Sequence, residues 1–210
     1  MKPIDYSDAP YPFRADFAEG HNRYWLRLAA PGHWLTGEQR VEVAKEVRHA
    51  RNCALCRERK AALSPSFVDG AHDAATQLPE IMVEVIHRVI TDSGRLTKKW
   101  FDGVIAQGLK AEEYIEIIGT LVHVFATDEF CRGLGIALNE LPNPQAGELS
   151  YYRPADVSYD DGAWVPLLPR TIDTGPEADL WDGTMYGNVV RALSLAPDDI
   201  RSLNDLMGIA

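Results

Sequence analysis

The sequence predicts an all-α fold, and three observations carry that prediction. Apolar residues recur at helical spacing in several segments, and capping residues stand where those segments begin. No segment shows the apolar–polar alternation that a half-buried strand requires. We therefore expect a bundle of packed helical hairpins.

The first long helix is expected over residues 38–62. Thr36 and Gln39 form a T-x-x-Q capping box, and no Pro or Gly follows until Pro65. The preceding segment, 1–34, is rich in Pro, aromatic and charged residues, and it reads as an irregular arm.

Three further helices follow. The stretch "LPEIMVEVIHRVITD" has Pro79 near its start and Gly94 just past its end, which predicts one helix. The stretch "RLTKKWFDGVIAQGL" predicts another, closed by Gly108, and "KAEEYIEIIGTLVHVFATDEFCRGLGIAL" predicts a long one. The buried stripe expected on that long helix consists of Tyr114, Ile117, Ile118, Leu121, Val122 and Phe125.

The remaining chain is dense in Pro, Gly and Asp and is expected to be loop from 142 to 176, followed by two short helices split at Pro197. These elements suggest an arm (1–34), a helical core (35–141) and a C-terminal region (142–210). Neither the arm nor the 142–185 segment has apolar periodicity, so each needs a surface to lie on. We expect a neighbouring subunit, and hence a homo-oligomer.

Composition and net charge limit the classes of binding partner that we expect. The 210 residues are 46% hydrophobic and 25% charged, as in ordinary globular proteins, and the net charge is −10. Such a chain repels polyphosphate, so we expect neither nucleic acid nor anionic membrane as partner. No apolar run approaches about 20 residues, and no signal-peptide core is visible, so a cytoplasmic location is expected. In a reducing cytosol, a Cys-x-x-Cys pair is typical of catalysis or metal binding rather than of a structural disulfide.

Ionisable and redox-active residues form a stripe within 38–62. Alternate steps of four and three residues place them on one face of a continuous helix, bordered by apolar side chains. The stripe consists of Glu42, Glu46, His49, Cys53, Cys56 and Lys60. This pattern favours a reactive strip set into a core over a solvated helix face.

The spacing suggests a proton relay that ends in a dithiol. Cysteines at i and i+3 of a helix lie within disulfide reach. A neighbouring base or cation lowers a thiol pKa, and His49 and Lys60 each lie one turn from a cysteine, while Glu46 lies one turn from His49. The alternatives are a surface histidine at His49 and a helix-dipole role for Lys60. The third cysteine, Cys131, is expected to be a small core residue.

The stretch from Leu35 to Leu141 resembles the AhpD-like alkylhydroperoxidase and carboxymuconolactone decarboxylase superfamily. The residues that carry the resemblance are "EVAKEVRHARNCALC" and "GLKAEEYIEIIGTLVHVFATDEFCRGLGIAL". The tail "GNVVRALSLAPDDIRSL" is similar to the ending of peroxidase-related members. The resemblance implies an antioxidant oxidoreductase that reduces a small hydroperoxide, takes electrons from a thiol donor, needs no cofactor and assembles into dimers, trimers or hexamers.

The resemblance also implies roles for single residues. Cys56 would attack the peroxide, and Cys53 would resolve the sulfenic acid into a redox-active disulfide. The family glutamate falls about twelve residues before the first cysteine, on Val41 here, so Glu42 and Glu46 are both candidates. Lys60 stands where the family has a histidine.

The missing imidazole has four candidate sources, which are His49, His72, His87 and His123. We favour His87, because Glu84 lies one turn before it on an otherwise apolar helix. A core histidine with a local partner is the simpler interpretation of His87.

Two other functions compete with the peroxidase. His49, Cys53 and Cys56, joined by His72, offer the two nitrogens and two sulfurs that suit tetrahedral zinc. Against this, a zinc Cys-x-x-Cys usually lies in a tight turn rather than inside a helix. The third possibility is a non-catalytic helical oligomer whose cysteines are relics of a redox ancestor.

Overall fold

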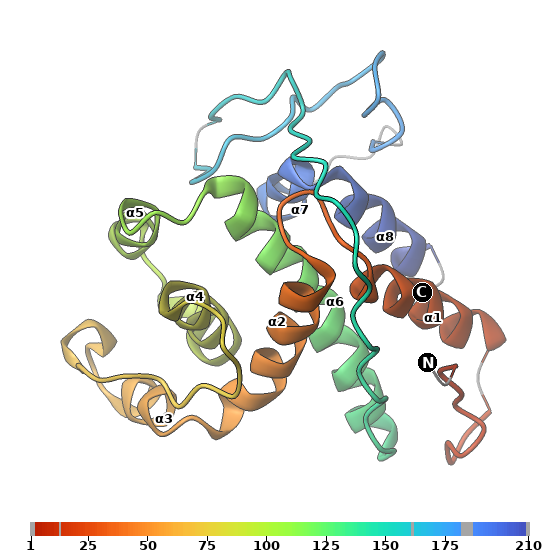
Figure 1. The fold of residues 1–210 in the computed structure, drawn as a ribbon, viewed down its shortest axis with the longest axis horizontal. Helices are drawn as coiled ribbons and strands as arrows, with labels where there is room; N and C mark the ends of the chain where they lie inside the picture. The colour runs from red at the N-terminus through yellow and green to blue at the C-terminus, as the bar shows by residue number, and fades with distance from the viewer. Residues whose placement is uncertain (1–2, 13, 161, 182–186, 209–210) are drawn as a thin grey trace.

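The computed structural model describes residues 3–12, 14–160, 162–181 and 187–208. Over these residues the chain is helical, which confirms the all-α prediction (Figure 1). The only β pairing in the described ranges is an isolated antiparallel bridge between Ser158 and Leu167. No described helix combines the length and apolar character needed to span a bilayer.

The helices are labelled in chain order. They are α1 (Ala15–Ala29), α2 (Gly37–His49), α3 (Ala54–Ala61), α4 (Glu80–Asp92), α5 (Lys98–Ala106), α6 (Ala111–Leu134), α7 (Asn188–Arg191) and α8 (Pro197–Met207). Short 3-10 turns join them at η1 (Ala50–Asn52), η2 (Pro65–Phe67), η3 (Ser93–Arg95) and η4 (Ala192–Leu195).

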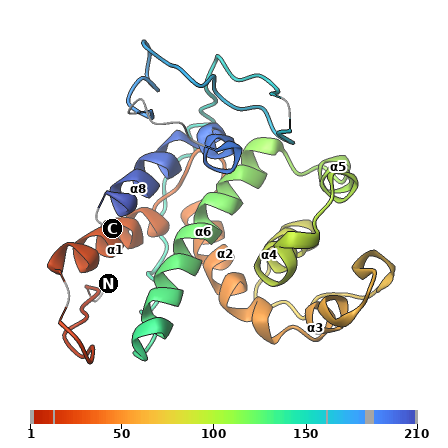
Figure 2. The same cartoon turned by 180° about the vertical axis from the view of Figure 1, so that it is seen from behind.

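Helix α6 is the centre of the fold. It contacts α1, α2, α4 and α8, so α1 and α8 lie on one side of the α2–α6 pair, and α3 and α4 lie on the other (Figures 1 and 2). The main core between these helices includes Trp25, Leu28, Val43, Ile86 and Ile117, each fully or almost fully buried. Burial of such side chains is the main force that holds the helices together.

The predicted buried stripe of α6 is confirmed in part. Ile117 and Leu121 are buried, and the other four members are partly buried. The helix ends four residues before the end of the quoted stretch, because Gly135 adopts the left-handed conformation with a φ of 70°. Helices α4 and α5 also lie where the sequence predicts them, and Pro197 occupies the first turn of α8.

The predicted arm at 1–34 is wrong in its central part, because residues 15–29 form helix α1. Tyr24, Trp25 and Leu28 are buried, and Trp25 donates from Nε1 to the Glu140 carbonyl at 2.8 Å. Its Ala, Leu, Arg and Glu residues favour a helix, and burial of one face stabilises the helix further despite Gly20. The apolar spacing of 24, 25 and 28 carried the signal.

The predicted continuous helix over 38–62 is also wrong. The capping box at Thr36 and Gln39 is present, but α2 ends at His49, η1 follows, and Cys53 has an extended ψ of 127° before α3 begins. The Asn52 carbonyl accepts from the Arg57 side chain at 2.9 Å. Asn is a weak helix former, and the break lets the chain turn Cys53 fully into the interior.

The described residues between 142 and 181 form no helix, as predicted for 142–176, and they pack on their own chain. Val165, Leu168 and Leu180 are buried in a second core with residues of α5, α6, η4 and α8. In Figures 1 and 2 this segment crosses over the end of the bundle beside α7. A neighbouring subunit is therefore not needed to cover it.

Candidate functional site

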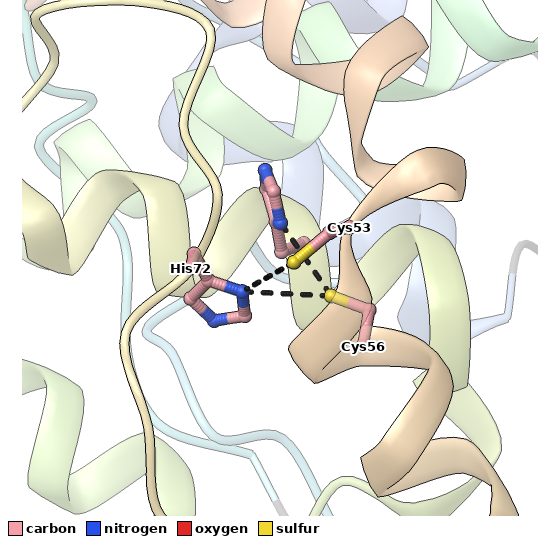
Figure 3. Close-up of side chains that lie close together, drawn as sticks. Cys53, Cys56 and His72 are labelled. Atoms are coloured by element: carbon pink, nitrogen blue, oxygen red, sulfur yellow. Dashed lines mark hydrogen bonds between the residues drawn. The ribbon is translucent and has the colours of Figure 1, made fainter.

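Two cysteines and two histidines converge where α3, α4 and the loop before α4 meet. Cys53 is the residue that precedes α3, Cys56 lies in its first turn, His72 comes from the loop, and His87 comes from the middle of α4. His72 Nδ1 lies 3.5 Å from both sulfurs (Figure 3), and His87 Nδ1 lies 3.4 Å from Cys56 Sγ. The four side-chain atoms lie within 4.8 Å of one another.

The cluster is enclosed by protein. Cys53 and His87 are completely buried, Cys56 is 2% exposed, and both cysteines are free thiols. The His72 side chain is 8% exposed. The electrostatic interactions among these groups are therefore stronger than they would be in water.

A carboxylate stands behind each histidine. Glu46 Oε2 lies 2.9 Å from His87 Nε2, and Glu84 Oε2 lies 2.7 Å from His72 Nε2. Each carboxylate accepts a hydrogen bond from the protonated Nε2 of its histidine, so that Nδ1 of each ring faces the sulfurs. Glu46 is held in place by the Ala75 amide at 2.8 Å.

Glu84 has two further partners. Arg59 donates from Nη1 to Glu84 Oε2 at 2.8 Å, and Trp100 donates from Nε1 to Glu84 Oε1 at 2.9 Å. Burial raises the Glu84 pKa, but the hydrogen bonds from His72, Trp100 and Arg59 outweigh it and lower the pKa to about 2. Glu84 is thus a fixed anion behind His72.

These contacts make the thiols acidic. Burial raises the Cys56 pKa, but hydrogen bonds from His72 and His87 outweigh it and lower the pKa to about 6. For Cys53 burial again raises the pKa, but hydrogen bonds with the Cys56 backbone amide and His72 outweigh this effect, so the pKa is lowered overall. The start of α3 adds a favourable dipole for anions at both positions.

The histidines shift in the opposite direction. Burial lowers the His72 pKa, but the contacts with Cys56 and Glu84 outweigh it and raise the pKa to about 10. The His87 pKa is also raised, because contacts with Cys56 and Glu46 outweigh the effect of burial. At neutral pH without a metal, the centre therefore favours a Cys56 thiolate beside a His72 imidazolium.

The structure brings together some of the predicted site residues. Glu46, Cys53, Cys56 and His87 meet as described, with His72. Glu42, His49 and Lys60 do not join them: among the described contacts, none links these three side chains to either sulfur. The stripe was predicted on a continuous helix, and the break at 50–53 changes its geometry: Glu46 reaches the centre through His87, and the His49 ring lies 6.2 Å from the His87 ring without contacting a sulfur.

The other predicted site residues lie elsewhere in the fold. His49 Nε2 lies 3.5 Å from Asp73 Oδ2, and Lys60 is exposed on α3. His123, another candidate for the missing imidazole, is stacked on Tyr24 in α1 with ring centroids 4.1 Å apart. Lys60 therefore does not supply the cation beside Cys56.

The acid–histidine pairs differ from those expected by spacing. The sequence suggested Glu46 with His49 and Glu84 with His87, as neighbours on one helix. The structure pairs Glu46 with His87 across α2 and α4, and Glu84 with His72 across α4 and the loop. Spacing along one helix gives no information about such contacts, and Arg59 and Trp100 were missed for the same reason.

Comparison with protein-family models, curated proteins and solved structures found no match to this chain. The resemblance to the AhpD-like superfamily thus stays a prediction from the quoted residues.

Proposed function

We propose that the chain is a thiol-dependent hydroperoxide reductase of AhpD-like type, with Cys53 and Cys56 as its redox dithiol. The observation that supports this most is the position of Cys56 Sγ against two imidazoles, one of which is paired with buried Glu46. A stabilised thiolate and a proton donor are the two groups that peroxide reduction requires at one sulfur.

The first step uses Cys56 and His87. The Cys56 thiolate attacks the terminal peroxide oxygen, the O–O bond breaks, and Cys56 becomes a sulfenic acid. The departing alkoxide takes a proton from His87 Nδ1, which lies 3.4 Å from the sulfur. Glu46 holds the His87 ring and stabilises its charged form before the transfer.

The second step uses Cys53 and His72. The Cys53 thiolate attacks the Cys56 sulfur, the S–O bond breaks, and hydroxide leaves as water with a proton from His72. One hydroperoxide is reduced to alcohol and water, and two thiols are oxidised to a disulfide. An external thiol then reduces the disulfide by exchange.

Cys56 is the better attacking thiol. Its sulfur lies 3.4 Å from His87 Nδ1 and 3.5 Å from His72 Nδ1, and against the effect of burial its pKa is lowered to about 6 chiefly by these two imidazoles, whereas backbone amides share in lowering the Cys53 pKa. The stabilising cations are therefore His72 and His87, in place of the Lys60 suggested by sequence.

A cavity of about 530 Å³ reaches the outer side of His72. Its lining combines apolar residues such as Leu78 and Ile81 with Glu84 and Trp100. An alkyl chain fits such a lining, so we take this cavity as the entry for substrate. Because His72 lines the cavity and also contacts both sulfurs, which do not line it, we expect rotation of the His72 ring to admit the peroxide.

Single cysteine variants test the proposal. Cys53→Ser should consume one equivalent of hydroperoxide and accumulate a sulfenic acid at Cys56 that dimedone traps. Cys56→Ser should consume almost none. Both are made in a Cys131→Ser background, because Cys131 is the third thiol and lies far along α6. Trapping at Cys53 in Cys56→Ser at the rate seen for the intact dithiol would reverse the assignment.

A further inference from the structure

The cluster also has the dimensions of a tetrahedral zinc site. Zinc binds thiolate sulfur at about 2.3 Å and imidazole nitrogen at about 2.0–2.1 Å, so a tetrahedron places sulfur and nitrogen about 3.6 Å apart. The three measured separations are 3.4, 3.5 and 3.5 Å. All remaining pairs lie within 4.8 Å, so small side-chain rotations complete the tetrahedron.

The histidines have the orientation that metal ligands need. A ligating histidine typically donates its second ring nitrogen to a carboxylate, which fixes the ring and leaves the other nitrogen for the metal. Both rings satisfy this, with Glu46 behind His87 and Glu84 behind His72. Redox chemistry at Cys56 needs only one such pair.

Charge favours a dication at this place. Two thiol sulfurs and two carboxylates lie around the centre with one arginine, Arg59, so acidic groups outnumber the permanent cations there. Uncompensated buried charge is costly, and a dication among the sulfurs offsets it. A set of two thiolates and two imidazoles selects zinc over the oxygen-seeking magnesium and calcium.

The backbone conformation of the Cys-x-x-Cys pair is compatible with zinc binding. The pair does not lie inside a helix, because Cys53 is extended and precedes α3. His87 takes the ligand position that the sequence analysis gave to His49, whose ring faces Asp73 instead.

We propose that the reduced centre binds one Zn²⁺ through Cys53, Cys56, His72 and His87, and that bound zinc shields the dithiol from hydroperoxide. With four protein ligands the site has no open position, so zinc there is not a hydrolytic catalyst. The shielding rests on the proposed reductase function, whereas the binding does not. Oxidation by one hydroperoxide consumes two protons, converts both thiolates to the disulfide and releases the ion.

Cobalt is the probe that reads the coordination. Chelator-treated, reduced full-length protein should bind one equivalent of Co²⁺ with the visible bands of a tetrahedral thiolate complex, and Zn²⁺ should displace it. Cys53→Ser and His72→Ala should each lower the affinity at least tenfold, and Glu84→Gln about 10–100-fold. His49→Ala and Cys131→Ser are matched controls that should bind like the unaltered chain.

The outcomes separate the two proposals. Failure to bind cobalt, an octahedral spectrum, or retention of binding in His72→Ala would overturn the zinc site, even if metal-free protein forms the disulfide with peroxide. Tight tetrahedral binding with an inert metal-free dithiol would uphold the site and overturn both the reductase and the shielding. Equal rates of peroxide oxidation with and without zinc would overturn the shielding alone.

Discussion

The two histidines of the centre differ in the carboxylate behind them. Glu46 is completely buried and also accepts from the Ala75 amide and the Thr76 hydroxyl, so His87 is held rigidly. The Glu84 side chain is 24% exposed and borders the cavity, as does His72. This difference suits a fixed proton donor at His87 and a ring at His72 that moves to admit substrate.

Removing the charge of Glu46 tests whether this carboxylate stabilises the His87 imidazolium. Glu46→Gln keeps the shape but no longer stabilises the His87 imidazolium, so the Cys56 pKa should rise. In the unaltered chain, alkylation of Cys56 should accelerate as pH rises through about 6, because the thiolate forms there. The variant should show a higher midpoint and at least about tenfold slower oxidation by peroxide near neutral pH.

Glu42→Gln is the matched control, since Glu42 lies on the same helix and has no hydrogen bond with the cluster among the described residues. Its midpoint should equal that of the unaltered chain. An unchanged midpoint in Glu46→Gln would contradict the relay.

Among the elements, those specified by local signals could be predicted and those specified by tertiary contacts could not. Helices α4, α5 and α6 follow from apolar spacing and from Pro or Gly at their ends. The break before Cys53 depends on burial against distant segments, whereas helix α1 has a local signal in the apolar spacing of 24, 25 and 28. The sequence likewise predicted Glu46, the cysteines and His87 as site residues, but the pairing across α2 and α4 required the fold.

A buried polar junction joins α1, α2, α6 and α8. Arg40 is completely buried and donates to Glu116 at 2.9 Å, while Arg27 donates to buried Asp199 at 2.9 Å. Gly119 of α6 makes room for this junction, because a Cβ there would lie 2.4 Å from Asp199 Oδ2. The close approach therefore requires glycine in mid-helix, against helix propensity.

Gly119→Ala should therefore destabilise the protein despite the better helix former. Propensity alone would stabilise it by up to about 1 kcal/mol, but overpacking typically costs about 1–3 kcal/mol. Gly103→Ala in α5 is the matched control, since a Cβ there meets nothing within 4 Å, and it should be neutral or slightly stabilising. Urea unfolding would measure both, and equal stabilisation by the two variants would refute the steric argument.

Among the described residues, the two larger hydrophobic cores share α6. The segment from 142 to 181 and helix α1 both pack on their own chain, so the original reason to expect an oligomer no longer holds. Another reason replaces it: Leu63 and Phe67, which follow α3, are 102% and 87% exposed. Large apolar side chains left in water together are typical of contact surfaces.

We accordingly still expect a homo-oligomer, now with contacts through the tip that carries Leu63 and Phe67. Light scattering should give a mass above the 23.4 kDa of one chain. The double variant Leu63→Glu, Phe67→Glu should lower that mass. The matched control Tyr159→Glu, which changes an exposed aromatic residue in the 142–181 segment, should not. A single-chain mass for the unaltered protein would contradict the expectation.

In the proposed reaction, Cys53 and Cys56 act together as one redox unit. The most direct test of this is to count thiols in reduced, metal-free protein after a pulse of one equivalent of hydroperoxide, with peptide mapping of the product. We expect rapid loss of two thiols per peroxide, a Cys53–Cys56 disulfide and an intact Cys131 thiol. Slow, independent loss of single thiols, or a disulfide that includes Cys131, would contradict it.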